Sequence, residues 1–204
     1  MTGMDPVWEQ TEQFRNAHFA GKLAWLPVDV FIVAELKLRL DIIPFEGLFA
    51  KYQHDAMLDP FTGIYVDAEA NQALLNKRGP ISKQKRFRFT FAHELGHFAM
   101  HQAIAAERKF ADFVQFFQWM HDESPDRYRT EQEANEFAGR LLVPRDRLEE
   151  DFAQLTAGLA SQAPGWQANQ ELRRGFADQL SDKYGVNAQV IEIRLDRESI
   201  WPAQ

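Results

Sequence analysis

The chain has 204 residues, of which 45% are hydrophobic and 13% aromatic, which is enough to bury a core and argues against disorder. It contains no cysteine, and this excludes disulfides, iron–sulfur clusters and thiolate zinc sites. The net charge of −7, from 23 basic and 30 acidic residues, disfavours direct nucleic-acid binding, because proteins of that class present a basic surface to phosphates.

Two further patterns bear on where the protein is located. The first residues lack the basic and apolar segments of a signal peptide. The sequence has no apolar run near the ~20 residues that a membrane-spanning helix needs. We therefore expect a soluble, cytoplasmic protein that does not enter a membrane.

The first third of the chain combines helix and strand patterns. Residues 28–40 are predicted to form a helix with apolar residues on one side. Residues 41–45 follow as a short strand, which Pro44 assigns to the edge of a sheet. Turn residues around the sequence IYV predict a second strand within residues 59–67.

The rest of the chain is predicted to be helical. A long helix is expected to begin after Ser82, a favourable N-cap residue, and to end near Gln102. Its basic run at residues 83–88 is expected to form a solvated face. Further helices are expected over residues 104–124, 127–142, 144–159 and 167–184, and in a last segment after Gly185 as a C-cap and Asn187 as an N-cap. Many helices and few strands predict an α+β fold with a small sheet.

The long helix contains the sequence FAHELGHFAMHQ, which has the HExxH pattern. Residues four apart on a helix share a face, so His93 and His97 can both point at one ion. In this pattern two histidines bind zinc and the glutamate, here Glu94, serves as general base. The other side of the helix has an apolar stripe of Phe87, Phe91, Leu95 and Phe98. We therefore expect the helix to pack by this stripe and to present its histidines on the opposite surface.

A catalytic zinc site needs a third protein ligand. A metzincin-type histidine is excluded, because position 103 is alanine and position 100 is methionine instead of glycine. The helix predicted at 127–142 offers Glu131 and Glu133. Glu131 lies at the margin of an apolar stripe, where an unpaired carboxylate is costly and a metal would compensate it.

Glu133 is the less favoured ligand, because it lies on another flank of the same helix. That flank includes Glu136 and Arg140, which are expected to form a solvent-exposed pair four residues apart. The predicted metal ligands are therefore His93, His97 and Glu131.

Several neighbouring residues are candidates for supporting roles. Asn135 lies four residues after Glu131 and can orient a ligand. His101 lies one turn beyond His97, too far to bind the same ion, so we expect it to support the site or to pack. His121 and Tyr128 precede the glutamate helix and are candidates for stabilising an oxyanion.

The sequences RFRFTFAHELGHFAMH and EQEANEFAGRLLVP together resemble the motifs of the ImmA/IrrE family of metallo-endopeptidases. The resemblance implies a mostly helical, zincin-like α+β domain of the gluzincin-like type, with a small sheet packed against the HExxH helix. It also implies the same ligands and the same catalytic role for Glu94. We expect an N-terminal segment at residues 1–27, the metallopeptidase domain at 28–150, and a helical C-terminal extension at 151–204 packed on that domain.

The resemblance further implies a protein substrate, a helix-turn-helix transcriptional repressor cleaved in stress response or mobile-element induction. Zinc is the expected cofactor, and Mn²⁺ or Fe²⁺ can occupy a His/His/Glu site. The alternative is a non-hydrolytic, metal-stabilised regulatory module that binds and sequesters a repressor. In that case the aromatic insert within residues 104–124 could form the docking surface.

Overall fold

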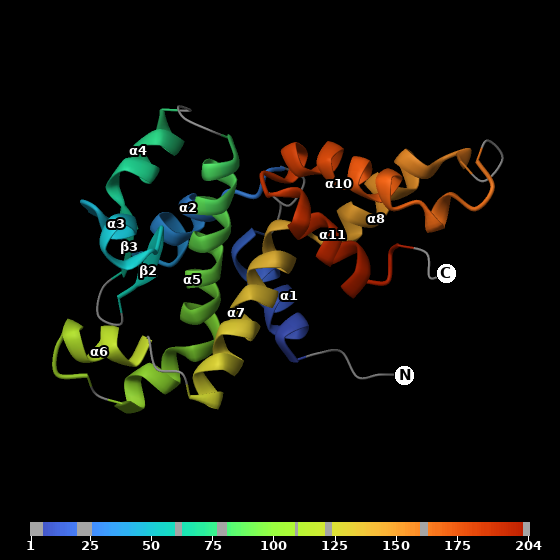
Figure 1. Cartoon of the computed structure of the whole chain (residues 1–204). Coiled ribbons are helices and arrows are strands. Elements are labelled where there is room, and N and C mark those ends of the chain that lie inside the picture. Colours follow the sequence, from blue (N-terminus) through green and yellow to red (C-terminus); the bar gives the residue numbers. More distant parts are fainter. Residues whose placement is uncertain are drawn as a thin grey trace.

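The computed structural model describes residues 6–19, 26–59, 63–76, 81–108, 110–120, 124–159 and 163–201 (Figure 1). Its helices are α1 (Pro6–Phe19), α2 (Val30–Ile32), the π-helical turn η1 (Val33–Lys37), α3 (Leu48–Tyr52), α4 (Ala68–Leu75), α5 (Ile81–Arg108), α6 (Phe113–Met120), α7 (Pro125–Leu142), α8 (Arg145–Thr156), the 3-10 turn η2 (Trp166–Ala168), α10 (Gln170–Tyr184) and α11 (Ala188–Arg197). The mostly helical α+β class predicted from the sequence is confirmed. No helix in these described ranges is long and apolar enough to cross a membrane.

One small sheet accompanies the helices. Its strands are β1 (Asp41–Phe45), β2 (Ala56–Leu58) and β3 (Gly63–Asp67), in the order β1-β3-β2. Strand β1 runs parallel to β3 and β2 runs antiparallel to it. Pro44 lies on an edge strand, as predicted, because its missing N–H would break the pairing of a central strand. The three-residue strand β2 was not predicted.

Several predicted helix boundaries differ from the structure. Helix α5 continues to Arg108 instead of ending near Gln102, and the helix predicted at 104–124 is divided between the end of α5 and α6. Helix α5 begins at Ile81, so Ser82 lies inside the helix and is not its N-cap. Helix α7 begins at Pro125, because the Ser124 side chain accepts a hydrogen bond from the Arg127 N–H and proline suits the first turn. The predicted caps between the last two helices are confirmed, with Gly185 at φ +63° after α10 and Asn187 before α11.

Helix α5 lies at the centre of the molecule, with the sheet and α4 on one side and α7 on the other (Figure 1). The apolar stripe predicted on α7 is buried, and so is that on α5 except for Phe98, which is partly buried; Phe87, Phe91 and Leu95 on α5 and Ala134, Phe137, Ala138, Leu141 and Leu142 on α7 all have 0% exposure. Gly96 lies at the crossing, where an added Cβ would be 3.1 Å from the Phe137 ring and 3.2 Å from Ala134 Cα. The helices can therefore approach closely because residue 96 has no side chain.

The prediction of a solvent-exposed pair on α7 is wrong. Glu136 and Arg140 are 7% and 5% exposed, because α1 and α11 cover this flank. Glu136 accepts hydrogen bonds from Trp8 Nε1 at 2.7 Å and from Arg194 at 2.6 Å. Arg140 donates instead to Glu198, at 2.7 Å. Each buried charge thus has a partner from a distant part of the chain.

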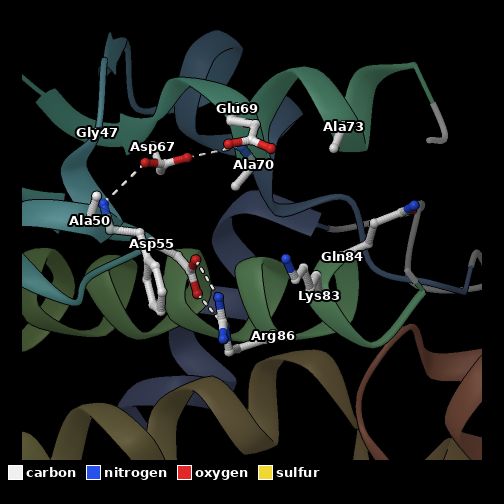
Figure 2. Close-up of a pocket in the computed structure, with 11 residues that line it drawn as sticks. Gly47, Ala50, Asp55, Asp67, Glu69, Ala70, Ala73, Lys83, Gln84 and Arg86 are labelled. Atoms are coloured by element: carbon white, nitrogen blue, oxygen red, sulfur yellow. Dashed lines mark hydrogen bonds and ion pairs between the residues drawn. The ribbon is translucent and has the colours of Figure 1, made fainter. Parts of the chain in front are cut away.

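The basic run at 83–88 does not form a purely solvated face, because three of its cations bind other elements. Arg86 donates to both carboxylate oxygens of Asp55, at 2.6 and 2.9 Å, beside a cavity of about 290 Å³ between α3, α4 and the start of α5 (Figure 2). Lys85 pairs with Asp182 at 2.6 Å, and Arg88 donates to the Val28 carbonyl at 2.6 Å. These contacts attach the first turns of α5 to the residue before β2, to the segment before α2 and to α10.

Candidate metal centre

Three side chains from α5 and α7 converge beside the centre of the molecule. The Nε2 atoms of His93 and His97 are 3.0 Å apart. The Glu131 carboxylate lies 3.1 Å from each, through Oε2 to His93 and through Oε1 to His97. The sequence-predicted ligands are therefore together in space, each with a ligand atom within 4.8 Å of the others.

These donors fit a divalent metal ion. A tetrahedral zinc with bonds of about 2.0–2.1 Å has ligand atoms about 3.3 Å apart, close to the observed separations. Asn135 Oδ1 lies 3.1 Å from His93 Nδ1, so a hydrogen on this ring nitrogen would leave Nε2 free to bind a metal. Glu131 Oε1 is buried, and both the Arg127 guanidinium and the His97 ring approach it. A cation between these electron-rich atoms would compensate their mutual repulsion.

The surroundings of the ligands set their charge states. His97 is 4% exposed, and burial lowers its pKa to about 4, so its ring is neutral as a metal ligand must be. Burial alone would raise the pKa of Glu131, but its contacts with the His93 and His97 rings hold that pKa well below its usual range. Glu131 is therefore an ionised carboxylate.

Glu94 lies next to the ligands and is only 3% exposed. Its Oε2 accepts a hydrogen bond of 2.7 Å from the backbone N–H of Leu58, on strand β2. Burial raises the pKa of Glu94 to about 7. The expectation that this side of α5 forms a surface is thus only partly right, because α7 and β2 cover much of it.

A cavity of about 250 Å³ borders His93, Glu131 and Glu94. It is lined by His54, Phe89, Thr90, His93, Glu94, Arg127, Glu131 and Asn135. Arg127 is 5% exposed, forms an ion pair with Glu131 and lies with its guanidinium 5.1 Å from the centre of the Trp119 ring. Sequence reasoning missed Arg127, although its position four residues before Glu131 favours an ion pair. It also missed His54, for which the sequence gives no signal.

The other candidates from the sequence have different positions. His101 is 5% exposed and contacts His97, so it lies directly behind a ligand. The Tyr128 side chain is 69% exposed and is not among the residues that line the cavity. His121 lies outside the described residues.

Comparison with known protein families agrees with this geometry. The model of the Peptidase_M78 family, described as the IrrE N-terminal-like domain, matches residues 74–196. The chain belongs to this family. The matched range includes both α5 and α7, and membership indicates a metallopeptidase-type function that acts on protein. No curated protein and no solved structure gave a significant match.

Proposed function

We propose that this member of the Peptidase_M78 family is a zinc-type endopeptidase in which His93, His97 and Glu131 bind one metal ion. The convergence of two imidazoles and a carboxylate within 3.1 Å, beside a cavity, is the observation that supports it most. Zinc is the proposed metal, because two histidines and a glutamate are a common catalytic zinc set. Mn²⁺ and Fe²⁺ accept the same donors.

In the proposed reaction Glu94 transfers a proton. When bound, the metal supplies a Lewis acid that lowers the pKa of a water molecule and polarises the scissile carbonyl. Glu94 accepts a proton from the attacking water and then donates it to the leaving amine nitrogen as the C–N bond breaks. A pKa near 7 suits both steps at neutral pH. The Leu58 N–H fixes one carboxylate oxygen, so the other is available for the proton.

Arg127 supplies positive charge at the cavity wall. Its guanidinium pairs with Glu131 and lies close enough to influence Glu94 and His97 electrostatically. A cation in this position can stabilise the carbonyl oxygen as it becomes negative. We therefore propose Arg127 for the oxyanion role that sequence reasoning gave to His121 and Tyr128.

The proposed substrate is a helix-turn-helix repressor, and the support for it is the resemblance of the two motifs to the ImmA/IrrE family. The alternative is sequestration of a repressor without cleavage, which would use the aromatic insert as a docking surface. Within this insert Phe116 is 1% exposed and the Phe117 ring lies 4.6 Å from that of Tyr52. Because these rings pack on the chain itself, the cleavage proposal is the better supported of the two.

Cleavage can be tested with a proteome-derived peptide library and mass spectrometry of new termini. Zinc-loaded wild type is expected to generate termini that Glu94→Gln does not, with a rate at least ~100-fold lower for the variant. The control is Glu149→Gln, which removes an exposed carboxylate on α8 and should cleave like wild type. Turnover retained by Glu94→Gln at equal zinc content would refute the role of Glu94.

A further inference from the structure

Behind His97, on the side away from Glu131, two more side chains continue a chain of contacts. His97 Nδ1 lies 2.9 Å from His101 Nδ1, and His101 Nε2 lies 2.9 Å from Glu133 Oε2. His101 comes from the next turn of α5, whereas Glu133 comes from α7, so the chain connects the two helices that supply the ligands. The other oxygen of Glu133 faces Arg129, at 4.0 Å.

The positions of the hydrogens along this chain follow from its outer end. Carboxylate oxygens accept hydrogen bonds, so the contact places the His101 hydrogen on Nε2, which donates to Glu133. A neutral imidazole has one N–H, so the Nδ1 of His101 is an acceptor and His97 must donate to it through its own Nδ1–H. The Nε2 of His97 then has no hydrogen and points its lone pair at Glu131. This is the form in which the atom can bind a metal.

We propose that His101 and Glu133 are positioning residues that hold His97 in its metal-binding tautomer and orientation. This inference rests on the proposed metal centre and adds a role for Glu133, which sequence reasoning considered only as a ligand. Neither residue touches the ligand atom itself, since both act through the Nδ1 side of His97. Hydrogen-bonded carboxylates behind ligand imidazoles also make them more basic, and their loss lowers metal affinity roughly 10–100-fold.

The two ligand imidazoles are supported differently. His93 Nδ1 lies 3.1 Å from the neutral side-chain amide of Asn135, and Asn135 is exposed. His97 Nδ1 faces a buried histidine that is itself backed by a carboxylate. The structure therefore predicts that substituting His101 or Glu133 weakens metal binding, because either substitution breaks the His97–His101–Glu133 hydrogen-bond chain. Such a network gives non-additive effects when two of its members are changed together.

The first test is the tautomer of each histidine in metal-free protein, read from long-range ¹H–¹⁵N NMR correlations. Wild type should show His97 with hydrogen on Nδ1 and His101 with hydrogen on Nε2. In Glu133→Leu the assignment of both rings should become mixed, whereas Glu133→Gln, which keeps an acceptor, should retain it. The matched control is Gln132→Leu, an exposed neighbour on α7 that should behave like wild type. The opposite tautomer of His97 in wild type would overturn the inference.

The second test is the dissociation constant for Zn²⁺, measured by competition with a chromogenic chelator. We expect roughly 10–100-fold weaker binding for His101→Phe and for Glu133→Leu, with the double variant no weaker than the weaker single variant. The Kd of Glu133→Gln for Zn²⁺ should lie between those of wild type and Glu133→Leu, because glutamine keeps an acceptor for His101. Such a graded result separates loss of the hydrogen-bond chain from loss of folding.

The outcomes distinguish this inference from the proposed function. If Glu131→Gln loses zinc but His101→Phe and Glu133→Leu bind it like wild type, the positioning role is refuted and the metal centre stands. If wild type itself binds no zinc, both are refuted.

Discussion

Replacing Gly96 by alanine tests whether the close approach of α5 and α7 assembles the metal centre. The new Cβ would lie 3.1 Å from Phe137 Cδ1, 3.2 Å from Ala134 Cα and 3.3 Å from the Ala134 carbonyl oxygen, whereas ordinary contacts begin near 3.4 Å. Two of these atoms are backbone and the Phe137 ring is 0% exposed, so none can rotate away. Overpacking of this kind costs about 1–3 kcal/mol, offset by about 1 kcal/mol of improved helix propensity.

The expected result is a loss of up to about 2 kcal/mol in the free energy of unfolding, measured with urea. Zinc affinity should fall as well, because Ala134 lies on α7 between Glu131 and Asn135; about 1 kcal/mol of strain in the site corresponds to a roughly fivefold weaker Kd. The control is Gly175→Ala in α10, where an added Cβ meets nothing within 4 Å, so stability should rise by about 0.5–1 kcal/mol. The reasoning would be refuted if Gly96→Ala raised the free energy of unfolding as much as Gly175→Ala does and left the zinc affinity unchanged.

Three further predictions concern the buried charges and the metal. Glu136→Gln should lower the free energy of unfolding by about 1.5–3 kcal/mol in urea titrations, because it removes one of the two carboxylates that pair with the buried Arg194 and leaves Glu198 as the other, whereas Glu149→Gln should change it by less than about 1 kcal/mol. Burial would raise the pKa of Glu136, but the hydrogen bond and charge of Arg194 lower it below its usual value. A depressed pKa in the folded state gives stability that is present above the unfolded pKa of about 4.3 and lost as the pH falls below it, so acid unfolding should be less steep in Glu136→Gln than in wild type. Chelation of zinc should lower the melting temperature, and at 100 times Kd the bound ion should contribute about 2.7 kcal/mol; Glu131→Gln should show no such dependence.

The sequence was sufficient to predict that His93, His97 and Glu131 lie together, because local patterns indicate their positions. The four-residue spacing of His93 and His97 depends only on helical geometry. Glu131 was identified from its place beside the apolar stripe of α7, which is buried as predicted. The edge position of Pro44 follows in the same way from the chemistry of one residue.

Other features depend on contacts between distant segments and could not be read from a local pattern. Glu136 and Arg140 have the spacing of a surface pair, and only the packing of α1 and α11 reveals that they are buried. Strand β2 is too short to give an alternating pattern, yet its Leu58 N–H holds Glu94. The contact between Glu133 and His101 likewise appears only when α7 is placed against α5.

The most direct test of the metal centre is the zinc content of the purified protein, measured by mass spectrometry after dialysis against zinc and then against buffer. Wild type and the control Glu149→Gln should each retain one equivalent, and Glu131→Gln should retain none. One equivalent in Glu131→Gln, or none in wild type, would contradict the proposed site of His93, His97 and Glu131.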